Sequence, residues 1–311
     1  MTLTASEFLW TTLLPAKAYQ EQKTSITKGV DGSVYIVGST QTGLDGEASK
    51  GNLDVFISKY SASGARVWTR IIGTGSDDAG FSVAVQGNNV FVAGSTRGGL
   101  DGTTNTGLSD AFITSYSTDG VGQWTKLLGT GQSETAYAIT TSSDGSVFVA
   151  GSTGGNLDNQ VNNGTDAFVS KISADGTKLW TRLIGSGNAD GANAITSGAD
   201  GSVYVAGYLR GVLNGGSEYG AFLTKYDANG NLAWSKVIGT FNGRSYEEGY
   251  GLATSADGSV YLVGSADFNN STLLSDASGN GAFITKFLSS GDQVWTKYIS
   301  TSGFDSALGK L

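Results

Sequence analysis

The sequence predicts an all-β fold made of a repeated unit of four short antiparallel strands. Three observations carry this prediction: tryptophans recur at a nearly constant spacing, strand-like segments recur with the same period, and glycine-containing turns separate them. Successive tryptophans lie between 54 and 61 residues apart, at Trp10, Trp68, Trp124, Trp180, Trp234 and Trp295. A long fixed period is typical of repeat architectures such as solenoids and propellers.

Each repeat contains four segments that are rich in Val, Ile, Phe, Tyr and Thr, as strands are. In the third repeat they are AITTSSDG (138–145), GSVFVAGST (145–153), DAFVSKIS (166–173) and LWTRLIG (179–185). The first and third connections are tight. We expect two-residue hairpins there, such as Asp144-Gly145, with a positive φ at the glycine. The second connection is a longer loop.

Four antiparallel strands repeated around an axis form the blades of a β-propeller, whose ring leaves only short strand edges exposed. The second strand, for example VYVAG (203–207), is apolar on both faces, as a strand covered by neighbouring blades must be. With the Trp strand outermost, five complete blades begin near residues 23, 80, 135, 191 and 249.

The two ends of the chain carry fragments of a further repeat. Residues 7–14 resemble an outer strand, and residues 304–311 resemble the start of an inner strand. We therefore expect a single β-propeller domain over residues 1–311, a six-blade ring that the chain carries incompletely, with these fragments side by side. A five-blade ring with a spare strand at each end is the alternative.

The composition excludes several function classes. The chain has no histidine and no cysteine, so disulfides, Cys/His zinc sites and His-dependent triads are excluded. Nineteen basic against 27 acidic residues give a net charge of −8, which argues against nucleic acid and anionic membranes as partners. No apolar run is long enough to span a membrane, and the first residues do not read as a signal peptide.

Acidic residues recur ten positions after the tryptophan or close to that place. In a closed ring their carboxylates would surround one mouth of the channel, where they would favour a cation such as calcium. The candidate metal residues are Asp78, Glu134, Asp190, Glu247 and Asp305. The alternative is that each acid accepts hydrogen bonds from its own turn.

The long loops between the second and third strands share a face with these acids. They contain GLDG (43–46 and 99–102) and NLDN (156–159), whose leucine we expect to plug the loop onto the blade. Two sets of aspartates in and after these loops are candidate calcium-ligand pairs or turn formers: Asp45, Asp101 and Asp158, with Asp54, Asp110 and Asp166. Variable loops on a rigid scaffold are where binding usually occurs.

The connection between the fourth and fifth repeats is longer than the others. It supplies the candidate ligand-binding residues Phe241, Arg244, Tyr246, Glu247 and Glu248. The tryptophans are expected to pack between blades. The lysines and arginines of the third and fourth strands are expected to protect strand edges.

The pattern DAFVSKISADGTKLWTRLIGSGNADGANAITSGADGSVYVAG (166–207) resembles the bacterial SBBP β-propeller repeat, and the resemblance extends over residues 8–309. Gly220 and Gly281 depart from it, since other copies have Asp there. The resemblance implies a scaffold of secreted or cell-surface bacterial proteins. We therefore expect a non-catalytic binding or structural module, with a protein or glycan partner on the long-loop face.

The alternative function is a glycan hydrolase that uses two carboxylates drawn from Asp78, Glu134, Asp190 and Glu247. Near-equivalent repeats argue against it, because a catalytic site needs residues that one blade has and the others lack.

Overall fold

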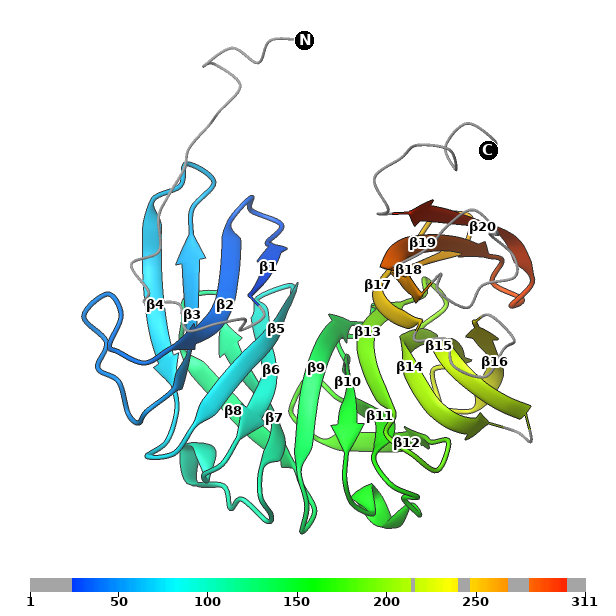
Figure 1. Cartoon of the computed structure of the whole chain (residues 1–311). Coiled ribbons are helices and arrows are strands. Elements are labelled where there is room, and N and C mark those ends of the chain that lie inside the picture. The colour runs from blue at the N-terminus through cyan, green and yellow to red at the C-terminus, as the bar shows by residue number, and fades with distance from the viewer. Residues whose placement is uncertain (1–23, 214–215, 240–246, 268–279, 301–311) are drawn as a thin grey trace. The chain divides into compact units, whose positions relative to one another are not determined.

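The computed structural model describes residues 24–213, 216–239, 247–267 and 280–300 (Figure 1). These residues form five sheets, each of four antiparallel strands that pair in chain order. The predicted all-β fold of four-stranded, propeller-like blades is therefore confirmed. Residues 7–14 and 304–311 lie outside the described residues, so ring closure and the choice between five and six blades stay predictions.

The chain divides into two compact units, Met1–Ala136 and Tyr137–Leu311. The single domain expected over the whole chain stays a prediction. The first unit contains two complete sheets. Their strands are β1 (Ser25–Lys28), β2 (Val34–Thr40), β3 (Asp54–Tyr60) and β4 (Arg66–Ile72), then β5 (Asp78–Gln86), β6 (Asn89–Thr96), β7 (Asp110–Ser117) and β8 (Gly122–Leu128).

The third sheet begins at the boundary between the units, and the second unit contains the fourth and fifth. The third comprises β9 (Glu134–Thr141), β10 (Val147–Thr153), β11 (Asp166–Ile172) and β12 (Lys178–Ile184). The others comprise β13 (Gly191–Ser197), β14 (Val203–Leu213), β15 (Gly216–Tyr226) and β16 (Leu232–Ile238), then β17 (Glu248–Thr254), β18 (Val260–Asp267), β19 (Asn280–Phe287) and β20 (Gln293–Ser300).

Neighbouring sheets within a unit pack face to face. In the first unit, Tyr35, Ile57 and Trp68 of the first sheet pack in one cluster with Val92 and Phe112 of the second. The second unit repeats this arrangement in two further clusters. The apolar stretches of β6 and β10 are fully buried, as their sequence predicts.

Trp68, Trp180 and Trp234 pack against the next sheet, as expected, and each donates a hydrogen bond to a turn of that sheet. In the first unit, Trp68 Nε1 and Lys59 Nζ each donate to the Thr118 carbonyl oxygen at 3.1 Å. Gly120 ends that turn with φ 80°, and a Cβ there would lie 2.9 Å from the Trp68 ring. Glycine is therefore required for the turn to lie against the indole.

The expectation that the lysines protect exposed edges is wrong for Lys59, Lys171 and Lys225. All three are buried, with at most 8% of their surface exposed. In the second unit Lys171 Nζ reaches the carboxylate of Asp144 at 2.9 Å and the carbonyl oxygen of Ala228 at 3.4 Å. These cations therefore join a turn of their own sheet to a turn of the next.

The Asp-Gly turns have the expected positive φ, from 77° at Gly201 to 84° at Gly145. They are not two-residue hairpins. Ser142 N donates to Ser146 O at 2.8 Å, and Gly145 N donates to Ser142 O at 3.0 Å, which leaves three residues in the loop. This is the hairpin in which a left-handed glycine follows a tight turn, and it too requires Gly at that position.

Candidate binding site

The predicted metal-site acids lie at the long-loop end of the sheets, where the chain passes from one sheet to the next. Asp78 and Glu134 begin β5 and β9, Asp190 precedes β13, and all three are fully buried. Their backbone N–H groups donate to the long loop of the preceding sheet, for example from Asp78 to Leu53 O at 2.8 Å. This shared position agrees with the sequence prediction.

Each of these carboxylates is held by the loop that precedes it. Asp78 Oδ2 accepts hydrogen bonds from Thr74 N at 2.6 Å and Thr74 Oγ1 at 2.9 Å. Glu134 binds the same two groups of Thr130, at 2.6 and 2.7 Å. Asp190 accepts from N and Oγ of Ser186. The alternative expectation, that each acid fastens its own turn, therefore describes these contacts.

A second buried acid accompanies each of them. Asp54, Asp110 and Asp166 begin β3, β7 and β11 and are at most 3% exposed. Burial raises the pKa of Asp110, and the charge of Glu134 raises it further. Burial likewise raises the pKa of Asp166, with Asp190 adding to the effect. Each junction therefore brings two acids together.

Glycine makes room for the second acid. A Cβ on Gly73 would lie 1.9 Å from Asp54 Oδ1, and Gly129 and Gly185 occupy the same place in the next two sheets. The described residues contain no group of three acidic side chains that could hold a metal ion. The expected calcium site therefore stays a prediction without a set of ligands in the described part of the chain.

The expected ligand-binding insertion is only partly described. Phe241, Arg244 and Tyr246, like the candidate metal residue Asp305, lie outside the described residues. Glu247 is 3% exposed. Glu248 forms an ion pair with Arg210 and accepts a hydrogen bond from the Tyr250 hydroxyl at 2.5 Å.

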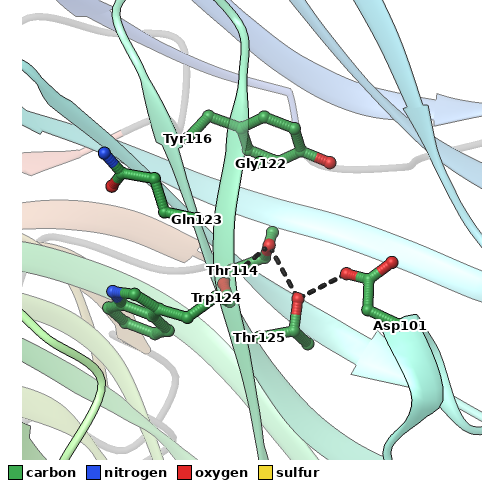
Figure 2. Close-up of a pocket in the computed structure, with 7 residues that line it drawn as sticks. All are labelled: Asp101, Thr114, Tyr116, Gly122, Gln123, Trp124 and Thr125. Carbon is green, nitrogen blue, oxygen red and sulfur yellow. Dashed lines mark hydrogen bonds between the residues drawn. The ribbon is translucent and has the colours of Figure 1, made fainter.

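A pocket of about 340 Å³ lies in the second sheet, where its long loop meets its outer strand. Figure 2 shows its residues: Asp101 from the 3-10 turn η2 (Leu100–Gly102), Thr114 and Tyr116 from β7, and Gly122, Gln123, Trp124 and Thr125 from β8. The Thr125 hydroxyl donates to Asp101 Oδ2 at 2.5 Å and lies 2.9 Å from Thr114 Oγ1 (Figure 2).

The loop turn that supplies Asp101 is built alike in the first three sheets. Its leucine, Leu100 in the second sheet, is buried as predicted, with Leu44 and Leu157 at the same place. The following aspartate has a positive φ of 49° at Asp101, and 58° and 54° in the other two sheets. This conformation is uncommon for a residue with a side chain, and it recurs because the leucine anchors the turn.

The sheets differ at the residue that faces this aspartate from the outer strand. In the first sheet Arg66 Nη1 contacts Asp45 Oδ1, and in the third sheet Lys178 Nζ contacts Asp158 Oδ1. The second sheet has Gly122 at this position, two residues before the tryptophan. Asp45 and Asp158 therefore have a cation of their own sheet as a partner, and the expected calcium-ligand pairs with Asp54, Asp110 and Asp166 stay a prediction.

Sequence reasoning missed this pocket because it treated the three loop aspartates as equivalent. A signal was present in the sequence: the residue two positions before Trp reads Arg, Gly and Lys in the first three repeats. Its meaning depends on the fold, because only the folded loop brings the aspartate over the outer strand.

The described sheets define a chain of four-stranded antiparallel blades, the class of propeller-type repeat proteins. Residues 123–158 match the SBBP family, described as a beta-propeller repeat, which confirms the resemblance expected from the sequence. The chain is 31% identical over 202 residues to the regulatory protein FlaEY of Caulobacter vibrioides, an alignment that covers 58% of this chain. The alignment covers 21% of that relative, so the chain spans about a fifth of its length.

Solved structures of low sequence identity are also similar. A Bacteroides caccae protein of unknown function has a TM-score of 0.40 at 10% identity, covering 85% of this chain and 93% of that chain. A mutant apocarotenoid oxygenase from Synechocystis has a TM-score of 0.45 at 9% identity, and the match covers 96% of this chain and 68% of that chain. Separately, none of the helices in the described ranges has the length and apolar character needed to cross a membrane.

Proposed function

We propose that this chain is a non-catalytic binding or structural module of a bacterial secreted or cell-surface protein, and that it engages a protein or glycan partner at the long-loop end of its sheets. The observation that carries the proposal is the state of the acids there. Asp78, Glu134 and Asp190 are fully buried, and each is bonded to its own loop.

The alternative, a glycan hydrolase, needs an acid and a base that touch the scissile bond. A buried carboxylate whose oxygens bind backbone amides meets neither requirement. The same arrangement also recurs at three successive junctions, as expected of residues that hold the loops in place. A scaffold role accounts for this repetition directly.

The comparisons support the class of the protein and leave the partner open. The match at residues 123–158 supports the propeller repeat itself, and the proposed location at the bacterial surface or outside the cell is what the resemblance to that family implies. The relative from Caulobacter carries the designation of a regulatory protein, which is compatible with a binding module.

The test is to assay the whole chain against aryl glycosides and polysaccharides, alongside the variants Asp78→Asn and Asp190→Asn. We expect no hydrolysis that depends on either acid, and we expect binding to one class of immobilised partner. Hydrolysis by the wild type that is lost in either folded variant would overturn the proposal in favour of the hydrolase.

A further inference from the structure

We propose that the pocket of the second sheet binds a cationic group, the guanidinium or ammonium of an arginine-like or lysine-like ligand, with Asp101 Oδ1 as its acceptor. This inference deepens the proposed function and rests on it, since it names the chemistry that one site of a binding module recognises.

The protein's own repeats show the bound state. In the first and third sheets the same carboxylate oxygen, Oδ1, contacts a cation from the outer strand, Arg66 or Lys178. In the first sheet the Thr69 hydroxyl donates to the other oxygen of Asp45 at 2.6 Å. The second sheet keeps the loop, the aspartate and the threonine and lacks the cation.

The carboxylate of Asp101 is available to a ligand. Oδ2 receives the Thr125 hydroxyl, which orients the group, while Oδ1 has no hydrogen bond or ion pair with any residue that the structure describes. Asp101 is exposed to solvent. Arg70, whose charge acts on the neighbouring Tyr116 phenol, is bound to Gly120 O at 2.9 Å and to Glu47 at 3.5 Å.

The remaining walls suit a cation that carries an alkyl stem. Tyr116 contributes aromatic surface, and aromatic faces attract ammonium and guanidinium groups. Burial, with Asp101 adding to it, raises the pKa of Tyr116 to about 12, so its phenol stays neutral at physiological pH. Asp101 is therefore the charged group among the seven residues that line the pocket.

The pocket has room for the missing side chain. Gly122 does not have a positive φ, and a Cβ there would lie 3.6 Å from Tyr116 Cε1, an ordinary contact. The variant Gly122→Arg should therefore fold and occupy the pocket from within, as Arg66 does in the first sheet. This provides a test that does not require removal of any binding group.

The experiment is an NMR titration of the isotopically labelled whole chain with n-propylguanidinium, at constant ionic strength. We expect saturable shifts at the Thr125 and Gly122 amides, with a millimolar dissociation constant, because a single solvent-accessible ion pair binds weakly. Neutral n-propylurea, of the same shape, should give no saturable shift. Asp101→Asn should weaken binding at least tenfold, and Gly122→Arg should abolish it.

The matched control is Asp45→Asn, which changes the equivalent aspartate of the first sheet and should leave the shifts at Thr125 and Gly122 unchanged. A blocked Gly-Arg-Gly peptide then separates two sources of the cation: tighter binding than propylguanidinium indicates a protein chain, and weaker binding indicates a free small molecule.

The proposal is overturned if propylurea binds as well as propylguanidinium, if Asp101→Asn binds as tightly as the wild type, or if no saturable shift occurs. Those results would leave the scaffold function standing. Conversely, acid-dependent glycan hydrolysis would overturn the scaffold function, and the NMR titration would still show whether the pocket binds a cation.

Discussion

The two ends of each sheet use aspartate in opposite ways. At the long-loop end, burial raises the pKa of Asp78, more than its bonds to Thr96 and Thr74 lower it. At the Asp-Gly turns the balance is reversed. Burial acts on Asp144 as well, but Lys171 and the Ser146 amide together lower its pKa to about 2. An ionised aspartate therefore destabilises the fold at the long-loop end and stabilises it at the Asp-Gly turns.

The difference follows from what faces each carboxylate. A turn aspartate receives the N–H two residues on, from Ser146 to Asp144 at 2.9 Å, and a buried lysine of the third strand. A long-loop acid faces another acid across the sheet junction, as Asp166 faces Asp190. Position in the blade thus decides the electrostatic role.

The largest effect is expected for Asp78→Ala. It removes a fully buried acceptor from the N–H and hydroxyl of the part-buried Thr74, which should lower the free energy of unfolding by about 2–3 kcal/mol. The equivalent change at a turn, Asp144→Ala, should cost less because that carboxylate is half exposed. Urea unfolding of both variants checks this, and equal losses would remove the distinction between the ends.

A smaller effect is expected at the turn end for Gly201→Val. Gly201 has φ 77°, a conformation that a β-branched residue resists, so the variant should lose more than about 1 kcal/mol of stability. Gly131→Val is the control, since Gly131 does not have a positive φ and a Cβ there meets no atom within 4 Å. An equal change in the urea midpoint of both variants would contradict the turn geometry.

The pH dependence of stability should have opposite signs for the two ends. An acid whose folded pKa is raised binds more protons when folded, so Asp78 should stabilise the fold as the pH falls toward its ordinary value of 3.8. An acid whose folded pKa is lowered does the reverse. The contribution of Asp144 is present above 3.8 and is lost as the pH falls toward about 2.

Melting temperatures measured between acid and neutral pH test these signs. Asp78→Asn should reduce the rise in melting temperature that the wild type shows as the pH falls toward 3.8. Asp144→Asn should reduce the fall in melting temperature that the wild type shows below pH 3.8. If Asp78→Asn keeps the wild-type slope above 3.8, its carboxyl does not have the raised pKa.

The smallest effect on stability is expected for Arg66→Gly, which copies the second sheet into the first. The ion pair with Asp45 involves a half-exposed arginine, so its loss should cost less than about 1 kcal/mol. The variant should instead gain a second site for propylguanidinium, seen as new shifts at Trp68 in the same NMR titration. Absence of that second site in a folded variant would show that an aspartate without its cation is not sufficient.

Much of the fold could be predicted from the sequence because its signals are local. Strand positions, the positive φ at Gly145 and the buried leucine of the long loops all follow from neighbouring residues. The turn length was predicted wrongly, since three-residue and two-residue loops both end in Asp-Gly. The role of Lys59 was also predicted wrongly, because its acceptor on Thr118 belongs to the next sheet.

The sequence by itself determined the period, the four strands of each repeat and the positions that need glycine, because these depend on backbone conformation and on the alternation of apolar residues. Only the tertiary structure decided which charged groups meet. Asp101 and Gly122 belong to different segments, and they line one pocket only because the buried Leu100 folds the loop back onto the outer strand. Burial and pairing across such contacts are set by packing, which is why the raised pKa of Asp78 had no signature in the chain and why the change to Gly122 acquired its meaning only in the folded blade.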